Sequence, residues 1–419
     1  LEDQLYQQLV DQLHLTPSSA EIARSLVHPT ENIDAYSAYL KGRRAMRGEQ
    51  DVANVQAAIR DYEDALKKDP NFALAYTGIA DSSLRMYRAT KDPAWAARAL
   101  SAAQQAQAID DKLVEVHVSL GNVYQATGRT SEAIVELKRA AELAPNSDDA
   151  HRRLGRAYLT SGRGDEAIES YRQAVAVNPY HWVNSDLLGA AYLQLGRYDA
   201  AIDSFKKVIE LAPDNVNGYN DLGAAYLRTA RFNEAIAAFQ KALKLQPIPN
   251  TYTNLGIAYA DAGRFTDAVP MFQKAVELQP NAEVFVGNLA DGYRWAGQRV
   301  EADKTYDRAI ALALKALQVN SRDAAIKGNL ALYYAKKGDA TSARRFMSDA
   351  RAIDKTSADL LYNEAVMSAL LKDTDRAFDD LNQALKAGLP FSSIETDPDL
   401  VKLRDDPRFA SLRRSAPHR

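Results

Sequence analysis

Small and apolar residues recur along the chain in a pattern with a period of 33 or 34 residues. Five consecutive copies carry the dipeptide Leu-Gly, with the glycines at Gly121, Gly155, Gly189, Gly223 and Gly256. When this glycine is numbered position 8 of its copy, apolar or small residues fall at positions 7, 8 and 11, on one side of a predicted helix. Apolar residues at positions 20, 24 and 27 predict a second helix. Such a period is typical of stacked helix pairs, each packed on its neighbours.

The residues that end and begin helices recur with the same period. Position 32 is Pro in six copies, which predicts the end of the second helix because proline lacks a backbone N–H. Glycine at position 15 predicts a left-handed residue that ends the first helix. Position 18 is Ser, Thr, Asn or Asp, which predicts the N-cap of the second helix. The tripeptide Arg163-Gly164-Asp165, an adhesion signal in some proteins, falls on this turn, so we interpret Asp165 as an N-cap.

The residues L-G-x-x-Y, A-x-x-x-[FY]-x-x-A and P at these offsets resemble the tetratricopeptide repeat (TPR). The resemblance implies an all-α fold, a right-handed α-α superhelical solenoid whose first helices line a concave face. With divergent copies on both sides, we expect about ten helix pairs over residues 31–390. Residues 391–419 contain Asp397-Pro398 and Asp406-Pro407, which predict two short capping helices and a loose tail. We expect the apolar residues of these helices to pack inward: Ile394, Leu400, Leu403 and Phe409.

Residues 1–30 form a separate region with an apolar stripe at helical spacing, from Leu1 to Leu13. These helices either cap the array or are the remnant of a preceding domain. The stretches "LEDQLYQQLVDQLHLTPSSAEIA" and "ENIDAYSAYLKGR" resemble a junction in large bacterial signalling proteins. There, a Ser/Thr kinase or winged-helix DNA-binding domain precedes a TolB-like segment and a TPR array. The resemblance implies that this chain is a piece of a longer protein, whose enzymatic or DNA-binding part lies outside it.

Composition narrows the class of partner. The net charge is -3, and the period differs from that of RNA-reading pentatricopeptide arrays, so we expect no nucleic-acid partner. No apolar run approaches the roughly 18 residues that span a membrane, so we expect no direct membrane insertion. The absence of Cys excludes disulfides and favours an extracytoplasmic location, although cytoplasm and periplasm both stay open.

The sequence gives little indication of enzymatic activity. There is no nucleophile–base motif and no phosphate-binding loop. His117 and His151 both occupy position 4, where we interpret them as packed side chains rather than ligands. The tyrosines at position 11 are expected to be core. We therefore predict a protein that is not an enzyme and that uses no cofactor and no metal.

The resemblance implies that positions 2, 5, 6, 9, 12 and 13 face the concave surface. Position 6 is Asn in three successive copies and Asp in the copy before them, and we call these four residues the asparagine ladder: Asp221, Asn254, Asn288 and Asn329. Each Asn amide offers a donor and an acceptor to an extended peptide. The alternative is that these amides are simply solvated. The nearby candidates are Asn217, Asn220, Asn250, Asp261, Asp291 and Trp295.

A second candidate site is a basic cluster on one predicted helix. Arg152 and Arg156 are four residues apart and share a face, with Arg153 beside them. They either dock an acidic segment or carboxy terminus, or pair with Glu115, Asp148 or Asp149, and we favour the pairing. The two-carboxylate clamp of chaperone-binding TPRs is not found, because position 9 is Asn122, then Arg156, then Ala190.

These observations predict a non-catalytic protein–protein interaction scaffold that binds a peptide or a partner domain on its concave face. Two alternatives stay open. The chain is a self-assembling structural solenoid, with the stripe from Leu1 to Leu13 as the contact. Or it is the substrate-positioning or regulatory region of a larger kinase or glycosyltransferase.

Overall fold

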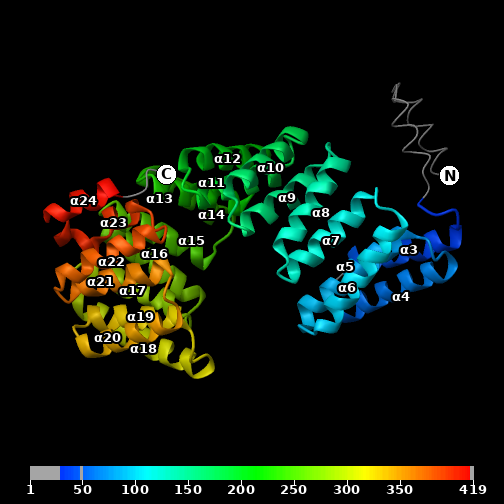
Figure 1. Cartoon of the computed structure of the whole chain (residues 1–419). Coiled ribbons are helices and arrows are strands. Elements are labelled where there is room, and N and C mark those ends of the chain that lie inside the picture. Colours follow the sequence, from blue (N-terminus) through cyan, green and yellow to red (C-terminus); the bar gives the residue numbers. More distant parts are fainter. Residues whose placement is uncertain (1–28, 48–50, 416–419) are drawn as a thin grey trace. The chain divides into compact units, whose positions relative to one another are not determined.

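The computed structural model describes residues 29–47 and 51–415, and within these ranges every regular element is a helix (Figure 1). The expectations for the head of the chain, including the stripe from Leu1 to Leu13, lie outside the described residues. The chain divides into two compact units, Leu1–Pro179 and Tyr180–Arg419. The sequence predicted one continuous array from 31 to 390 and did not predict this division.

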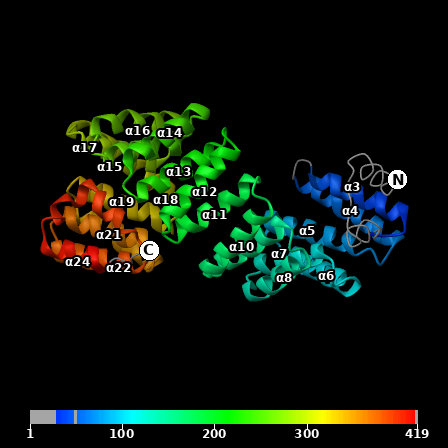
Figure 2. The ribbon, with the colours of Figure 1, turned by 90° about the horizontal axis from the view of Figure 1, so that it is seen from above.

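The first unit contains four helix pairs in its described part, and in each pair a first helix packs on a second (Figure 2). The pairs are α3 (Ile33–Arg47) with α4 (Val52–Lys68), α5 (Ala73–Thr90) with α6 (Pro93–Ile109), α7 (Val114–Ala126) with α8 (Thr130–Leu143), and α9 (Asp148–Thr160) with α10 (Gly164–Val177). Pro93 opens α6, with the Asp92 side chain as its N-cap.

The second unit contains six pairs and a C-terminal segment. The pairs are α11 (Trp182–Gln194) with α12 (Tyr198–Leu211), α13 (Val216–Arg228) with α14 (Phe232–Leu245), α15 (Pro249–Asp261) with α16 (Phe265–Leu278), α17 (Glu283–Trp295) with α18 (Arg299–Val319), α19 (Ala324–Lys336) with α20 (Ala340–Ile353), and α21 (Ala358–Leu370) with α22 (Thr374–Lys386). The described residues thus hold ten pairs, which confirms the predicted all-α helical-repeat solenoid. The handedness of its superhelix stays a prediction.

In several pairs the two helices approach closely where a glycine faces a large ring. A Cβ built on Gly223 would lie 2.6 Å from the ring of Phe239, and one on Gly256 would lie 2.6 Å from the ring of Phe272. Both rings are buried. The same glycine–aromatic contact occurs in the pairs of α9 with α10 and of α11 with α12. In these pairs a small residue at position 8 thus packs against a large one at position 24 of the same repeat.

The turn inside each pair confirms one prediction and corrects another. Glycines at position 15 have positive φ, between 72° and 85°, as expected for a left-handed residue. In the pair of α13 and α14, Ala230 takes this place with φ 55°. The predicted N-caps are wrong: α10 begins at Gly164, its N-cap is Arg163, and Asp165 is its second residue. The Arg163 N–H donates to Tyr158 O at 2.9 Å, which closes the turn and starts the second helix two residues earlier than expected.

Arg163 of the adhesion-like tripeptide is engaged within its own repeat. Its guanidinium lies over the Tyr158 ring, 4.6 Å from the centroid, and pairs with Glu166 at 2.8 Å. The same two contacts recur for the arginines at the equivalent turns, Arg129, Arg231 and Arg264. The recurrence supports the interpretation of the tripeptide as part of the repeat.

The C-terminal segment consists of α23 (Phe391–Thr396), the 3₁₀ helix η1 (Pro398–Leu403) and α24 (Pro407–Ser415). Both Asp-Pro pairs begin helices, as predicted: Asp397 accepts from the N–H of Asp399 and Asp406 accepts from the N–H of Arg408. The four apolar residues expected to pack inward are all buried: Ile394, Leu400, Leu403 and Phe409. They pack against α21 and α22, so the segment covers the end of the last pair.

Candidate partner-binding cavity

The second unit contains a cavity of about 430 Å³, which we call the inner cavity. One wall comes from the first helices of five successive pairs, α13, α15, α17, α19 and α21. The wall residues of these helices occupy positions 5, 6, 9, 12 and 13, which are among the positions expected to face inward: Ala224, Leu227, Arg228, Asn254, Ile257, Asp261, Asp291, Trp295, Leu332, Lys336, Tyr362, Asn363 and Val366.

The other wall of the inner cavity is the stretch from Ser392 to Asp399. Hydrogen bonds at several points tie it to the first helices. The Arg228 guanidinium donates to Ser393 Oγ at 2.9 Å, and Tyr362 Oη donates to Ser393 O at 3.0 Å. Trp295 Nε1 donates to Asp399 Oδ1 at 3.0 Å. The C-terminal segment therefore converts an open groove into a space with walls on two sides.

A buried ionic network holds this wall at α17 and α19. Asp291 accepts from Lys336 Nζ at 2.6 and 2.7 Å and also accepts from the Tyr306 hydroxyl. Asp399 accepts from Arg294, and its other oxygen lies 3.7 Å from Lys336. Burial alone would raise the pKa of Asp399, but Lys336 and Arg294 hold that pKa below its ordinary value. The charged groups in this network, Asp291, Asp399 and Lys336, are thus already paired within the unit.

On the first helices of the second unit, Asp186, Asp221 and Asp261 have no such cation paired with them in the described part of the chain. Burial, and then the nearby Asp397, raise the pKa of Asp261 to about 7, against an opposing effect of Arg228. Burial and Asp186 raise the pKa of Asp221 to about 6, and burial raises that of Asp186 itself. Within the described residues, none of the ion pairs involves Asp186, Asp221 or Asp261.

Asp397 is a further carboxylate of the second unit that has no cation paired with it among the residues that the structure describes. It lines the inner cavity from the C-terminal wall and shares the single proton of the neutral Tyr362 hydroxyl with Ser393 O. Burial and the neighbouring Asp399 raise its pKa to about 6.

The structure separates the members of the asparagine ladder. Asn254 lines the inner cavity, whereas Asn329 donates to Glu283 Oε1 at 3.1 Å. Asn288 and Asp221 are half-buried, and neither lines the cavity. The ladder is therefore not one continuous surface around this cavity.

The remaining candidates on these helices also fall into different places. Asp291 and Trp295 line the inner cavity, and both are already hydrogen-bonded inside the unit. The Oδ1 atom of Asn220 is buried without a hydrogen-bond partner. Asn217 and Asn250 are exposed near the beginning of α13 and α15. Of the candidates predicted from the sequence, the inner cavity brings together four: Asn254, Asp261, Asp291 and Trp295.

The basic cluster lies in the first unit, on α9. Arg152 pairs with Asp149 at 3.1 Å and Arg153 pairs with the same carboxylate at 2.6 Å. This is one of the pairings favoured from the sequence. Arg156 is exposed, and among the described residues it forms no ion pair. A site for an acidic segment on this helix stays a prediction.

Sequence reasoning missed several residues of the inner cavity: Arg228, Lys336, Tyr362, Asp397 and Asp399. A signal existed for the first two, because position 13 is polar or aromatic in four successive copies. No sequence signal placed the Asp-Pro-Asp stretch against α17, since that contact spans about a hundred residues.

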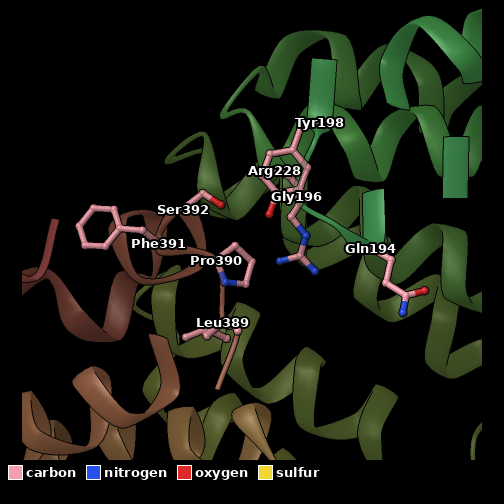
Figure 3. A pocket seen from close by; sticks show the side chains of 9 residues that line it. Gln194, Gly196, Tyr198, Arg228, Leu389, Pro390, Phe391 and Ser392 are labelled. Atoms are coloured by element: carbon pink, nitrogen blue, oxygen red, sulfur yellow. The ribbon is translucent and has the colours of Figure 1, made fainter. Parts of the chain in front are cut away.

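A smaller pocket of about 200 Å³ adjoins the turn between α11 and α12. Gln194, Gly196 and Tyr198 form one side, and the stretch from Gly388 to Ser392 forms the other. Figure 3 shows the Arg228 side chain extending between Tyr198 and Pro390. Arg228 and Ser392 line both this pocket and the inner cavity, so the two spaces adjoin at these residues.

Other chemistry is limited in the part of the chain that the structure describes. There, no group of three or more His, Asp or Glu residues is arranged to hold a metal ion. His117 is buried between Glu136, at 2.6 Å from its Nδ1, and the Asp111 carbonyl, at 2.7 Å from its Nε2. Over the same residues, no helix combines the length and the apolar character needed to cross a membrane.

The repeated helix pairs and their inward-facing positions define a helical-repeat scaffold for protein–protein interaction. Family models described as TPR repeat or tetratricopeptide repeat match residues 118–181, 189–229 and 217–281. The chain belongs to the TPR superfamily. Proteins built from these repeats are generally non-catalytic, and the repeats indicate protein or peptide partners.

Solved structures similar to the chain include other proteins of this kind. MamA AMB-1 is 32% identical, and the match covers 41% of this chain and 95% of that one, with a TM-score of 0.36. The thermophilic TPR protein TTC0263 of Thermus thermophilus is 22% identical over 46% of this chain and 99% of that one, with a TM-score of 0.38. YrrB, described as a TPR protein with an unusual peptide-binding site, is 20% identical over 44% and 92%, with a TM-score of 0.36. No curated protein matches the sequence.

Proposed function

We propose that this scaffold binds an extended segment of a partner protein on the inner face of the Tyr180–Arg419 unit. The observation that carries the proposal is the inner cavity, whose wall is built from the same few repeat positions of five successive first helices. Successive repeats present equivalent positions at regular intervals, as an extended peptide presents its side chains.

The chemistry of the wall suits a peptide. The amides of Asn254 and Asn363 offer both donors and acceptors to a backbone. Leu227, Ile257 and Val366 provide apolar surface between them. A volume of about 430 Å³ is in the range of small-ligand pockets, so it fits one or a few residues of a segment and not a folded domain.

The test begins with an array of nonapeptides probed with the purified full chain, followed by affinity measurement on the best binder. Asn254→Ala should weaken binding by roughly three- to tenfold, the effect of one hydrogen bond. Asn233→Ala is the matched control, because Asn233 is exposed at the beginning of α14 and does not line the cavity. Equal affinities for Asn254→Ala and the parent chain, or no binder on the array, would contradict the proposal.

The other functions expected from the sequence have no specific support in the described residues. Self-assembly through the stripe from Leu1 to Leu13 concerns residues outside them. A place within a larger signalling kinase or glycosyltransferase likewise stays a prediction.

A further inference from the structure

Two carboxylates line the inner cavity, one from each of its two walls. Asp261 is at the end of α15, and Asp397 is at the junction of α23 and η1. Both side chains line this one cavity, and their removal from water raises the pKa of both groups, with Asp397 further raising that of Asp261. Their common surroundings decide which ligand groups this end of the cavity favours.

The charges lining the cavity do not balance. Four carboxylates line it, Asp261, Asp291, Asp397 and Asp399, against two cations, Arg228 and Lys336. Lys336 is bound by Asp291 and Asp399, and Arg294 adds a second cation to Asp399. In the described chain Asp261 and Asp397 form no ion pair: Arg228 faces Asp261 but donates to the neutral Ser393 hydroxyl, and Lys336, which lowers the pKa of Asp397, is bound by the other two carboxylates. When both carboxylates are ionised, this end of the cavity therefore carries excess negative charge, which a bound cation would stabilise.

We propose that the inner cavity selects a positively charged group of the partner segment, held by Asp261 with Asp397. The group is an ammonium or guanidinium, supplied by a Lys or Arg side chain or by the amino terminus of the segment. This inference rests on the proposed function, and it names the chemical class of the partner as a basic segment. Asp261 is the residue that determines this specificity.

The rest of the cavity suits the same ligand. Trp295 and Tyr362 line it, and aromatic rings attract cations. Ile257 and Val366 offer apolar surface for the aliphatic stem of a long basic side chain. An acidic side chain would instead meet two carboxylates in a space with little water, where repulsion is strong. Charge and shape together favour a basic group over an acidic one.

The experiment uses the full chain and an array of nonapeptides printed in two forms, with free and with acetylated amino termini. We expect the binders to be enriched in Lys or Arg, or to require the free terminus, and the two forms distinguish these sources. The best binder is then titrated against Asp261→Asn, which keeps the size of the side chain and removes its charge. Affinity should fall by roughly ten- to hundredfold, the effect of a charge-assisted hydrogen bond.

Asp203→Asn is the matched control, because Asp203 is exposed on α12 and outside the cavity lining. It should leave the affinity unchanged, and circular dichroism should show both variants folded. Binders that are acidic or neutral, or basic binders that Asp261→Asn holds as tightly as the parent, overturn this inference. If such binders are still weakened by Asn254→Ala, the proposed function survives, whereas an array without any binder removes both.

Discussion

Trp295 donates a hydrogen bond from its indole Nε1 to Asp399 Oδ1, 3.0 Å away, although the two residues are 104 positions apart in the chain. The Asp399 side chain is only 3% exposed, and Arg294 binds it from α17. The C-terminal segment is therefore a fixed wall of the second unit, and any partner that reaches the inner cavity meets it.

The network around Asp399 makes a stability prediction. Asp399→Ala would leave Arg294 and Lys336 buried with one carboxylate fewer, and breaking a buried ion pair in this way costs about 3–5 kcal/mol. Urea denaturation followed by far-UV circular dichroism measures the change. Asp405→Ala is the control, since Asp405 is exposed, and it should shift the free energy of unfolding by less than about 0.5 kcal/mol. A similar loss for both variants would argue against the network.

A substitution at Ala230 is expected to raise the free energy of unfolding rather than lower it. This alanine has φ 55° at the turn where the equivalent residues of other pairs are glycines, and a left-handed conformation costs an Ala roughly 1–2 kcal/mol. Ala230→Gly should therefore stabilise the chain, by about 0.5–1 kcal/mol after the extra freedom of glycine in the unfolded state is subtracted. Ala224→Gly, in the middle of α13, is the control and should destabilise by about 1 kcal/mol. A loss of stability in Ala230→Gly would contradict the strain at this turn.

The period in the sequence predicted the ten pairs, because they depend on contacts within a repeat or between neighbours, whereas the inward-facing positions were implied by the resemblance to the TPR. Gly223 against Phe239 is such a contact. The N-caps were placed two residues too late, since the closure of the turn by the Arg163 N–H has no signal in residue type alone. The C-terminal wall was not predicted as part of a site, because Trp295 and Asp399 meet only through the curvature of several repeats.

The glycine–aromatic contacts predict a steric effect. In Gly256→Ala the new Cβ would lie 2.6 Å from the Phe272 ring, so α15 and α16 would have to separate. We expect a loss of about 1–3 kcal/mol, typical of overpacking. In a double-mutant cycle, Phe272→Leu should recover part of this loss, because a smaller side chain leaves room for the methyl group. Strict additivity of the two substitutions would show that they do not act through one contact.

The raised pKa values predict how stability depends on pH. Burial and Asp397 raise the pKa of Asp261 from 3.8 to about 7, with Arg228 opposing, so the folded chain keeps a proton that the unfolded chain releases. Between about pH 4 and pH 7 the folded state binds more protons, and the free energy of unfolding falls as the pH rises, by up to about 1.4 kcal/mol per pH unit for one proton. Asp397, with a pKa of about 6, acts in the same direction.

Urea midpoints measured across this pH window test the prediction. Asp261→Asn should flatten the slope, because the amide does not titrate, and Asp203→Asn should keep the slope of the parent chain. The same slope in all three proteins would show that Asp261 titrates as an ordinary surface carboxylate.

Hydrogen exchange followed by mass spectrometry, on the full chain with and without its best-binding array peptide, tests the central claim most directly. We expect the peptide to slow amide exchange in the first helices of the second unit, above all in α13, α15 and α17, and in the stretch from Ser392 to Asp399. We expect little change in the second helices α14 and α16. Protection confined to those second helices, or to the first unit, would contradict the claim that the inner face of the second unit binds the partner.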